Sequence, residues 1–118
     1  MEKLLVFGVN DTDYQKIRSI AGRMRLGCER VLPDAYGCTL GQIADGAASA
    51  SPVTHTFSES LLVMCGLSGK RIDKLLFELR HGNVSVDYKA ILTPTNRSWT
   101  VPQVFFEMHR EKASLRQP

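Results

Sequence analysis

Three polar junctions in this sequence carry residue types that can bind an anion. Each junction follows an apolar segment and precedes a segment with helical periodicity. The unpaired backbone N–H groups at the start of a helix, together with the positive end of its dipole, favour a negatively charged ligand. The candidate ligand-binding residues at the three junctions are Asn10, Asp11, Ser68, Gly69, Lys70, Thr93, Thr95, Asn96 and Arg97.

Helix capping is the competing interpretation of these junctions. Asn10 and Ser68 stand where N-caps are expected, and caps of this kind occur in most helices. In the third junction, Asn96 can bond the backbone of its own turn while Arg97 extends into solvent or pairs with a carboxylate. In a binding site, both side chains would instead face a ligand crevice. The sequence favours the structural role for Asn96 and leaves the binding site as a hypothesis.

The residue types at a few positions exclude two kinds of protein that bind or transfer phosphate. Residues 66–71 lack the first glycine of a phosphate loop and have Arg71 where a magnesium-binding Ser or Thr belongs. A phospho-receiver domain needs a carboxylate at the end of its third strand, where Cys65 stands. Cys65 itself has no histidine placed to act as its base. No catalytic residue is therefore predicted, and the sequence favours a protein that is not an enzyme.

The remaining charged side chains have simple structural explanations. Lys89 lies on a predicted edge strand, where it can extend along the sheet with Asp87 as its partner. The basic side chains of residues 14–25 spread around one helix without interleaved aromatic residues, which is typical of a solvated surface. We therefore expect no nucleic-acid partner.

Composition narrows the class of protein. A chain of 118 residues with 43% hydrophobic and 23% charged residues is one ordinary globular domain over residues 1–118. The net charge of +3 tolerates an anionic partner. Three cysteines without a C-x-x-C motif indicate reduced thiols, with no metal site and no cofactor. No apolar run is long enough for a signal-peptide core or a membrane span, which predicts a cytoplasmic protein without a membrane partner.

Strands and helices alternate along the chain. Apolar runs predict strands at residues 4–9, 28–32, 61–66 and 86–92. Helical spacing and capping residues predict one helix from about Tyr14 that ends at Gly27, and others at residues 39–45, 68–80 and 100–112. Small side chains without periodicity predict a mobile loop at residues 46–57, and residues 113–118 are expected to form a loose tail.

This alternation predicts an α/β fold with a parallel four-stranded sheet and helices on both faces, in three layers. The wholly apolar strands, the first and the third, belong in the centre, which gives the order 2-1-3-4. In such a sheet, a crevice opens at the carboxyl ends between the first and third strands. The three polar junctions would converge there.

The segment from Lys89 to Thr100, with Thr93-Pro94-Thr95-Asn96-Arg97 and Trp99 at its centre, resembles a bacterial family of proteins of about this length. Leu4-Leu5-Val6-Phe7-Gly8, Leu32-Pro33 and Cys65-Gly66 extend the resemblance more loosely. That family is a domain of unknown function. The resemblance implies a bacterial, cytoplasmic protein and implies no activity.

The function that this sequence predicts is a binding module for a small anionic ligand at the strand-end crevice. The alternative is a protein-interaction or regulatory domain without a small-molecule site. Similar sheets carry many unrelated functions, so the fold alone does not choose between the two.

Overall fold

The computed structural model describes residues 2–53 and 57–116, with residues 113–116 described by their backbone alone. The chain divides into two compact units. The sheet unit contains Met1–Val31 and Phe57–Leu92, and the second unit contains Leu32–Thr56 and Thr93–Pro118. The expectation of one domain over residues 1–118 stays a prediction.

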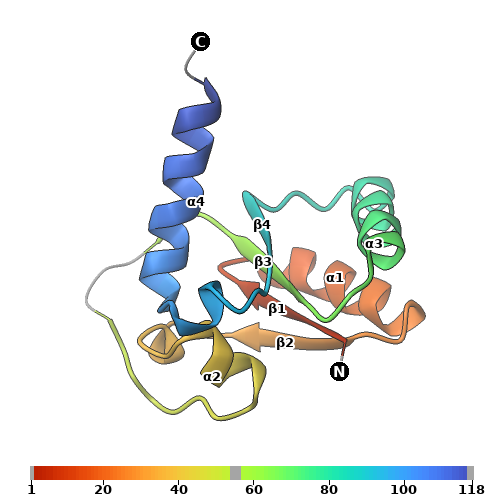
Figure 1. The fold of residues 1–118 in the computed structure, drawn as a ribbon. Helices are drawn as coiled ribbons and strands as arrows, with labels where there is room; N and C mark the ends of the chain where they lie inside the picture. Colours follow the sequence, from red (N-terminus) through yellow and green to blue (C-terminus); the bar gives the residue numbers. More distant parts are fainter. Residues whose placement is uncertain (1, 54–56, 117–118) are drawn as a thin grey trace. The chain divides into compact units, whose positions relative to one another are not determined.

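The sheet unit holds a four-stranded sheet in the order β2-β1-β3-β4, as the sequence predicts (Figure 1). Its strands are β1 (Lys3–Phe7), β2 (Gly27–Val31), β3 (Leu61–Cys65) and β4 (Tyr88–Ile91). The prediction of an all-parallel sheet is wrong. The pairs β1–β2 and β3–β4 are parallel, but β1 and β3 are antiparallel, with Lys3 opposite Cys65 and Phe7 opposite Leu61.

The length of the connection between β2 and β3 explains this error. A single crossover helix joins β1 to β2, and another joins β3 to β4, so each of these pairs must be parallel. The connection from β2 to β3 instead runs through residues 32–56 of the second unit. No crossover helix determines the direction of β3 relative to β1, so β3 can pair with β1 in either direction.

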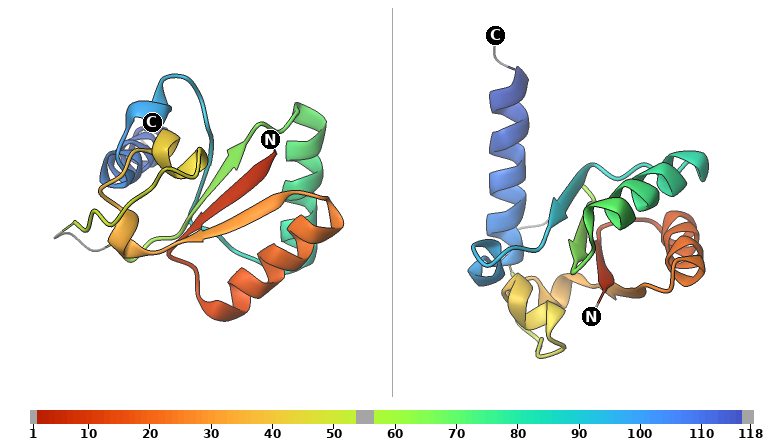
Figure 2. Two further views of the ribbon diagram at one scale, coloured as in Figure 1. Left: turned by 90° about the horizontal axis from the view of Figure 1, so that it is seen from below. Right: turned by 45° about the vertical axis from the view of Figure 1, so that its right-hand side comes forward.

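Both crossover helices cover the same face of the sheet, α1 (Asp11–Arg23) beside α3 (Gly69–His81) (Figure 2). A parallel sheet in this order would place them on opposite faces. Here the two crossovers lead outward in opposite directions from strands that also run in opposite directions. The two reversals cancel, so right-handed crossovers put both helices on one side.

The core of the sheet unit lies between these helices and the sheet. Leu4 and Val6 of β1, with Leu62 and Met64 of β3, pack against buried residues of both helices. The opposite face of the two central strands is also buried, because Leu5, Phe7, Leu61 and Val63 have no exposed surface. This agrees with the continuous apolar runs from which the central strands were predicted.

The sheet unit contains an internal repeat with a constant separation of 58 positions. Gly8 and Gly66 both have positive φ, and Asn10 and Ser68 both cap the following helix. Both helices have 13 residues. Residues 3–26 therefore correspond to residues 61–84, although only Leu4/Leu62, Gly8/Gly66 and Lys16/Lys74 are identical pairs.

The helix ends repeat in the same way. Arg25 has φ 58° and Asn83 has φ 55°. Leu26 N–H donates to the Ala21 carbonyl, and Val84 N–H donates to the Leu79 carbonyl. This is the Schellman arrangement, in which a left-handed residue ends the helix. The prediction that Gly27 ends the first helix is wrong, because Arg25 makes the turn and Gly27 begins β2.

The second unit is built from short helical segments and one longer helix. Thr39 caps α2 (Leu40–Ala44) and forms a capping box with Gln42. Thr39 also pairs with Thr100, and Leu40 N–H donates to the Trp99 carbonyl. The elements of this unit are η1 (Pro33–Ala35), α2, η2 (Asn96–Ser98) and α4 (Val101–Arg116).

Two predicted boundaries of the second unit change. The α4 helix continues to Arg116, beyond its expected end near Lys112, and so takes up part of the expected tail. Residues 113–116 contain good helix formers and a basic C-terminal turn, both of which favour continuation. In the predicted loop, residues 46–53 form no helix or strand and Ser51 bonds Asp34 and Gly37, while residues 54–56 lie outside the described part. The mobility of the loop stays a prediction.

Candidate binding groove

The junction residues predicted within the sheet unit do not come together. Asn10 and Asp11 follow the carboxyl end of β1, whereas Ser68, Gly69 and Lys70 follow the carboxyl end of β3. Because β1 and β3 are antiparallel neighbours, the carboxyl end of one strand lies beside the amino end of the other. The crevice expected between the ends of β1 and β3 does not form, for the same reason.

Most of the predicted junction residues in the sheet unit have structural partners. The Asn10 side chain accepts a hydrogen bond from Asp13 N–H at 2.8 Å, and the Ser68 hydroxyl accepts one from Arg71 N–H at 3.4 Å. Asp11 pairs with Arg30 of β2 at 2.7 Å. Lys70 is exposed on the first turn of α3, and the position of a side chain at Gly69 faces open space.

The turn at residues 93–97 has the features that its structural interpretation predicts. Thr93 N–H donates to the Asn96 side-chain oxygen at 2.8 Å, and Asn96 N–H donates to the Thr93 hydroxyl at 3.1 Å. Arg97 pairs with Asp45 at the end of α2. Thr95 accepts a hydrogen bond from the Ser98 hydroxyl at its carbonyl. Within the second unit, these bonds hold the turn against α2, where a ligand-binding role stays a prediction.

Asp87 and Lys89 make different contacts from those expected. The Asp87 carboxylate accepts hydrogen bonds from the backbone and hydroxyl of Ser60, at 2.8 and 3.1 Å. Lys89 donates to the Val86 carbonyl at 3.5 Å. The predicted Asp87–Lys89 partnership is therefore wrong, and Asp87 instead joins the starts of β3 and β4.

A small cluster at the β2 edge combines a phenol, a thiol and a guanidinium. Arg30 lies 5.1 Å from the centre of the Tyr14 ring and donates to the Val9 carbonyl at 3.0 Å. Burial raises the pKa of the Cys28 thiol. Burial and the neighbouring Cys28 raise the pKa of Tyr14. Both groups are thereby held in their protonated forms, which argues against a reactive thiolate.

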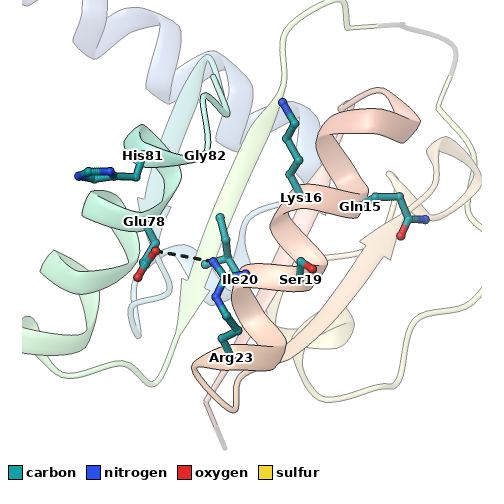
Figure 3. Close-up of a pocket in the computed structure, with 8 residues that line it drawn as sticks. All are labelled: Gln15, Lys16, Ser19, Ile20, Arg23, Glu78, His81 and Gly82. Carbon is teal, nitrogen blue, oxygen red and sulfur yellow. Dashed lines mark ion pairs between the residues drawn. The ribbon is translucent and has the colours of Figure 1, made fainter.

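A groove lies between α1 and α3 of the sheet unit (Figure 3). Its volume is about 410 Å3, and the buried side chain of Ile20 lies at its base. Arg23 of α1 and Glu78 of α3 meet across it at 3.6 Å. Lys16 extends toward one end of the groove, whereas Arg23 extends toward Glu78 across it (Figure 3). The other lining residues are Gln15, Ser19, His81 and Gly82.

A second hollow lies on the side of α3 that faces away from α1. It is lined by Phe77, Arg80 and His81, and its volume is about 420 Å3. The His81 ring points away from α1 (Figure 3). Its centre lies 4.2 Å from that of the Phe77 ring. Phe77 is 49% exposed. His81 therefore belongs to the walls of both hollows.

The surface around these hollows carries the positive charge of the chain. Residues 11–25 and 69–81 hold eight Lys and Arg against four Asp and Glu. The whole chain holds 15 and 12, so the remainder has seven basic and eight acidic residues. The net positive charge is thus concentrated on the layer formed by α1 and α3, which favours an anionic partner there.

Sequence reasoning did not find this groove. It placed the basic residues of α1 on a solvated surface, because the aromatic and acidic side chains beside them come from α3. Their proximity depends on the direction of β3 relative to β1, which local sequence patterns do not indicate.

In the part of the chain that the structure describes, nothing points directly to a metal site or a membrane span. Among the residues that it describes, no three or more His, Cys, Asp or Glu side chains gather as they would around a metal ion. No helix within the same described residues has both the length and the apolar composition that a membrane crossing requires.

One family model matches part of the chain. Residues 60–115 match the family model of DUF3783, a domain of unknown function. The match begins at Ser60 and covers β3, α3, β4 and α4 almost to its end. No curated protein and no solved structure matches the chain significantly. Residues 60–115 are therefore similar to DUF3783, a domain whose function is unknown.

Proposed function

We propose that this protein is a binding module for a small anionic ligand, and that the groove between α1 and α3 holds the ligand. The observation that carries this proposal is the placement of Lys16 and Arg23 along one groove with the hydroxyl of Ser19 between them in sequence. Cationic and hydroxyl donors around an open hollow are the groups that bind phosphate and carboxylate.

Arg23 can exchange its ion pair with Glu78 for a bound anion. Its side chain is 62% exposed and that of Glu78 is 28% exposed, and exposed pairs of this kind contribute little stability. An anion can therefore compete with Glu78 for Arg23 at small cost. The negative charge of Glu78 repels an anionic ligand, so removal of this charge should strengthen binding.

Binding of inorganic phosphate and ribose 5-phosphate, measured by calorimetry at low ionic strength, tests this function. Lys16→Gln and Arg23→Gln should each weaken binding about tenfold, because each removes a charge-assisted hydrogen bond. Glu78→Gln should strengthen binding. Lys74→Gln is the matched control, since Lys74 is the equivalent of Lys16 in the repeat but does not line the groove. Equal affinities for all four variants would remove the groove as the site.

A protein-interaction role is the second candidate. Among the side chains that the structure describes, four large apolar ones are exposed, namely Leu32, Phe77, Ile91 and Phe106. Two belong to each unit, so they support this role only if a screen with anions shows no binding at all. In that case the exposed apolar residues become the first positions to substitute.

We further propose a bacterial, cytoplasmic protein, with no nucleic-acid or membrane partner. The three cysteines are free, which supports a reducing compartment. We keep the nine junction residues of the sequence analysis as lower-ranked binding candidates, with Lys70 the foremost because it is exposed and cationic. Lys70→Gln beside Lys16→Gln in the same titration ranks the two sites.

A further inference from the structure

We infer that the anion bound in the α1–α3 groove is a nucleoside phosphate, with its base stacked on Phe77 and its phosphate bound by Lys16 and Arg23. This inference rests on the proposed function, which requires only an anion. It adds the second hollow, which shares His81 with the groove. One ligand that crosses α3 at His81 can fill both.

Phe77 offers an aromatic face without serving the core. It is 49% exposed, and its ring contacts the His81 ring at 4.2 Å between centres. Bases stack favourably on exposed aromatic rings, and stacking does not depend strongly on the base. Arg80 lines the same hollow and supplies a guanidinium that can stack on the base or reach a phosphate.

The repeat shows that the fold does not require these side chains. The residues equivalent to Phe77, Arg80 and His81 in α1 are Ser19, Gly22 and Arg23. The same backbone is thus formed with a small hydroxyl and a glycine in place of the ring and the guanidinium. An exposed phenylalanine that the fold does not need is explained by a ligand with an aromatic surface.

A single nucleotide fits this surface better than a strand of RNA. Binding of single strands uses several platforms on which successive bases stack. Within α1 and α3, both fully described, the only other phenol or phenyl ring is Tyr14, which Arg30 overlies. One platform and one cationic groove correspond to one base and one phosphate group.

Calorimetry with AMP, CMP, ribose 5-phosphate and a single-stranded oligonucleotide tests the inference. The nucleotides should bind about tenfold more tightly than ribose 5-phosphate, which has the same phosphate but no base. Phe77→Ala should abolish this difference and leave the affinity for ribose 5-phosphate unchanged. Phe106→Ala is the matched control, because Phe106 is a more exposed phenylalanine, at 65%, in the second unit.

Each outcome separates the two proposals. Equal binding of ribose 5-phosphate and AMP, with sensitivity to Lys16→Gln, would overturn the nucleotide inference and leave anion binding intact. Tighter binding of the oligonucleotide than of AMP and CMP would overturn it in favour of RNA. Absence of binding by every anion would overturn both. In support, AMP but not ribose 5-phosphate should shift the NMR signals of the Phe77 ring protons.

Discussion

The two halves of the sheet unit have the same backbone and different surfaces. Residues 3–26 and 61–84 repeat strand, glycine turn, capped helix and Schellman ending at a separation of 58 positions. The side chains that repeat in kind are those that build the fold, the glycine, the cap and the buried apolar positions. The fold therefore leaves the remaining positions free to differ, and functional residues are best sought at the positions that differ between the two halves.

Two differences between the halves are prominent. The first half has Tyr14 and Cys28 where the second has Ile72 and Lys89, according to the repeat and the strand registers. The second half also has three additional residues, 85–87, between its helix and its outer strand. These differences, together with the rings on α3, lead to the following tests.

The largest expected effect tests whether the halves share one core. Leu4→Ala and Leu62→Ala each remove an equivalent, fully buried side chain from the same cluster. Each should lower the free energy of unfolding by about 3 kcal/mol in urea denaturation followed by circular dichroism. Leu32→Ala, at a 56% exposed position, is the control and should change it by less than about 0.5 kcal/mol. A small loss for only one of the core variants would show that the halves are not equivalent in stability.

The next effect concerns the glycine turn. Gly8 has φ 69°, and a Cβ there would lie 2.7 Å from the Glu59 carbonyl oxygen. Gly8→Ala should therefore cost about 2 kcal/mol or more, from the backbone strain and the clash together.

Gly22→Ala is the matched control for the turn. Gly22 lies inside α1, and a Cβ there meets nothing within 4 Å. The substitution should raise stability by about 0.5–1 kcal/mol, because alanine loses less backbone freedom on folding. If Gly22→Ala were destabilising and Gly8→Ala were tolerated, the helical conformation of Gly22 and the positive φ of Gly8 would both be contradicted.

Sequence patterns were sufficient for the local features of both halves. The positions of the strands, their order, and the caps at Asn10, Thr39 and Ser68 follow from apolar runs and capping residues. The direction of β3 could not be predicted in this way, since it depends on a long connection through the second unit. Local patterns carry no information about such a choice.

The same strand direction decides the site. Lys16, Arg23 and Glu78 approach one another only because α1 and α3 share a face, and they share it because β3 runs against β1. A sequence interpretation with all strands parallel places these helices on opposite faces and brings the strand-end junctions together instead. Because the direction of β3 was predicted wrongly, the site was predicted at the carboxyl ends of the strands and not between the two helices.

The three additional residues of the second half lead to the third prediction. Asp87 accepts two hydrogen bonds from Ser60, which is only 8% exposed. Asp87→Ala should lower the free energy of unfolding by about 1–2 kcal/mol, because Ser60 loses its acceptor in a place with little water. Asp87→Asn keeps an acceptor oxygen and should cost less. Equal stability of the alanine variant and the wild type would show that the Ser60–Asp87 contact does not stabilise the second half.

The fourth prediction is a gain in stability at the end of α1. Arg25 and Asn83 occupy equivalent left-handed positions, but only asparagine adopts that conformation readily. Arg25→Gly should raise the free energy of unfolding by about 0.5–1 kcal/mol, and Asn83→Gly should raise it by less. A larger gain at Asn83 would mean that strain is distributed differently between the two halves.

The smallest effect is a pH dependence that belongs to the first half. Burial raises the pKa of Cys28, and burial with the nearby thiol raises that of Tyr14. The native state therefore keeps these protons at a pH where the unfolded chain has begun to release them. Linkage then requires the free energy of unfolding to fall as the pH rises above the ordinary thiol pKa of about 8.5.

The variant Tyr14→Phe/Cys28→Ala isolates this contribution. It should lose less stability than the wild type between neutral and alkaline pH in parallel urea titrations, because neither group can then ionise. Some alkaline sensitivity should remain, since burial also raises the pKa of Tyr36 in the second unit. Ile72→Ala, the substitution at the position equivalent to Tyr14, removes no titrating group and should leave the slope with pH unchanged. A wild-type slope in the double variant would assign the alkaline sensitivity to groups outside the first half.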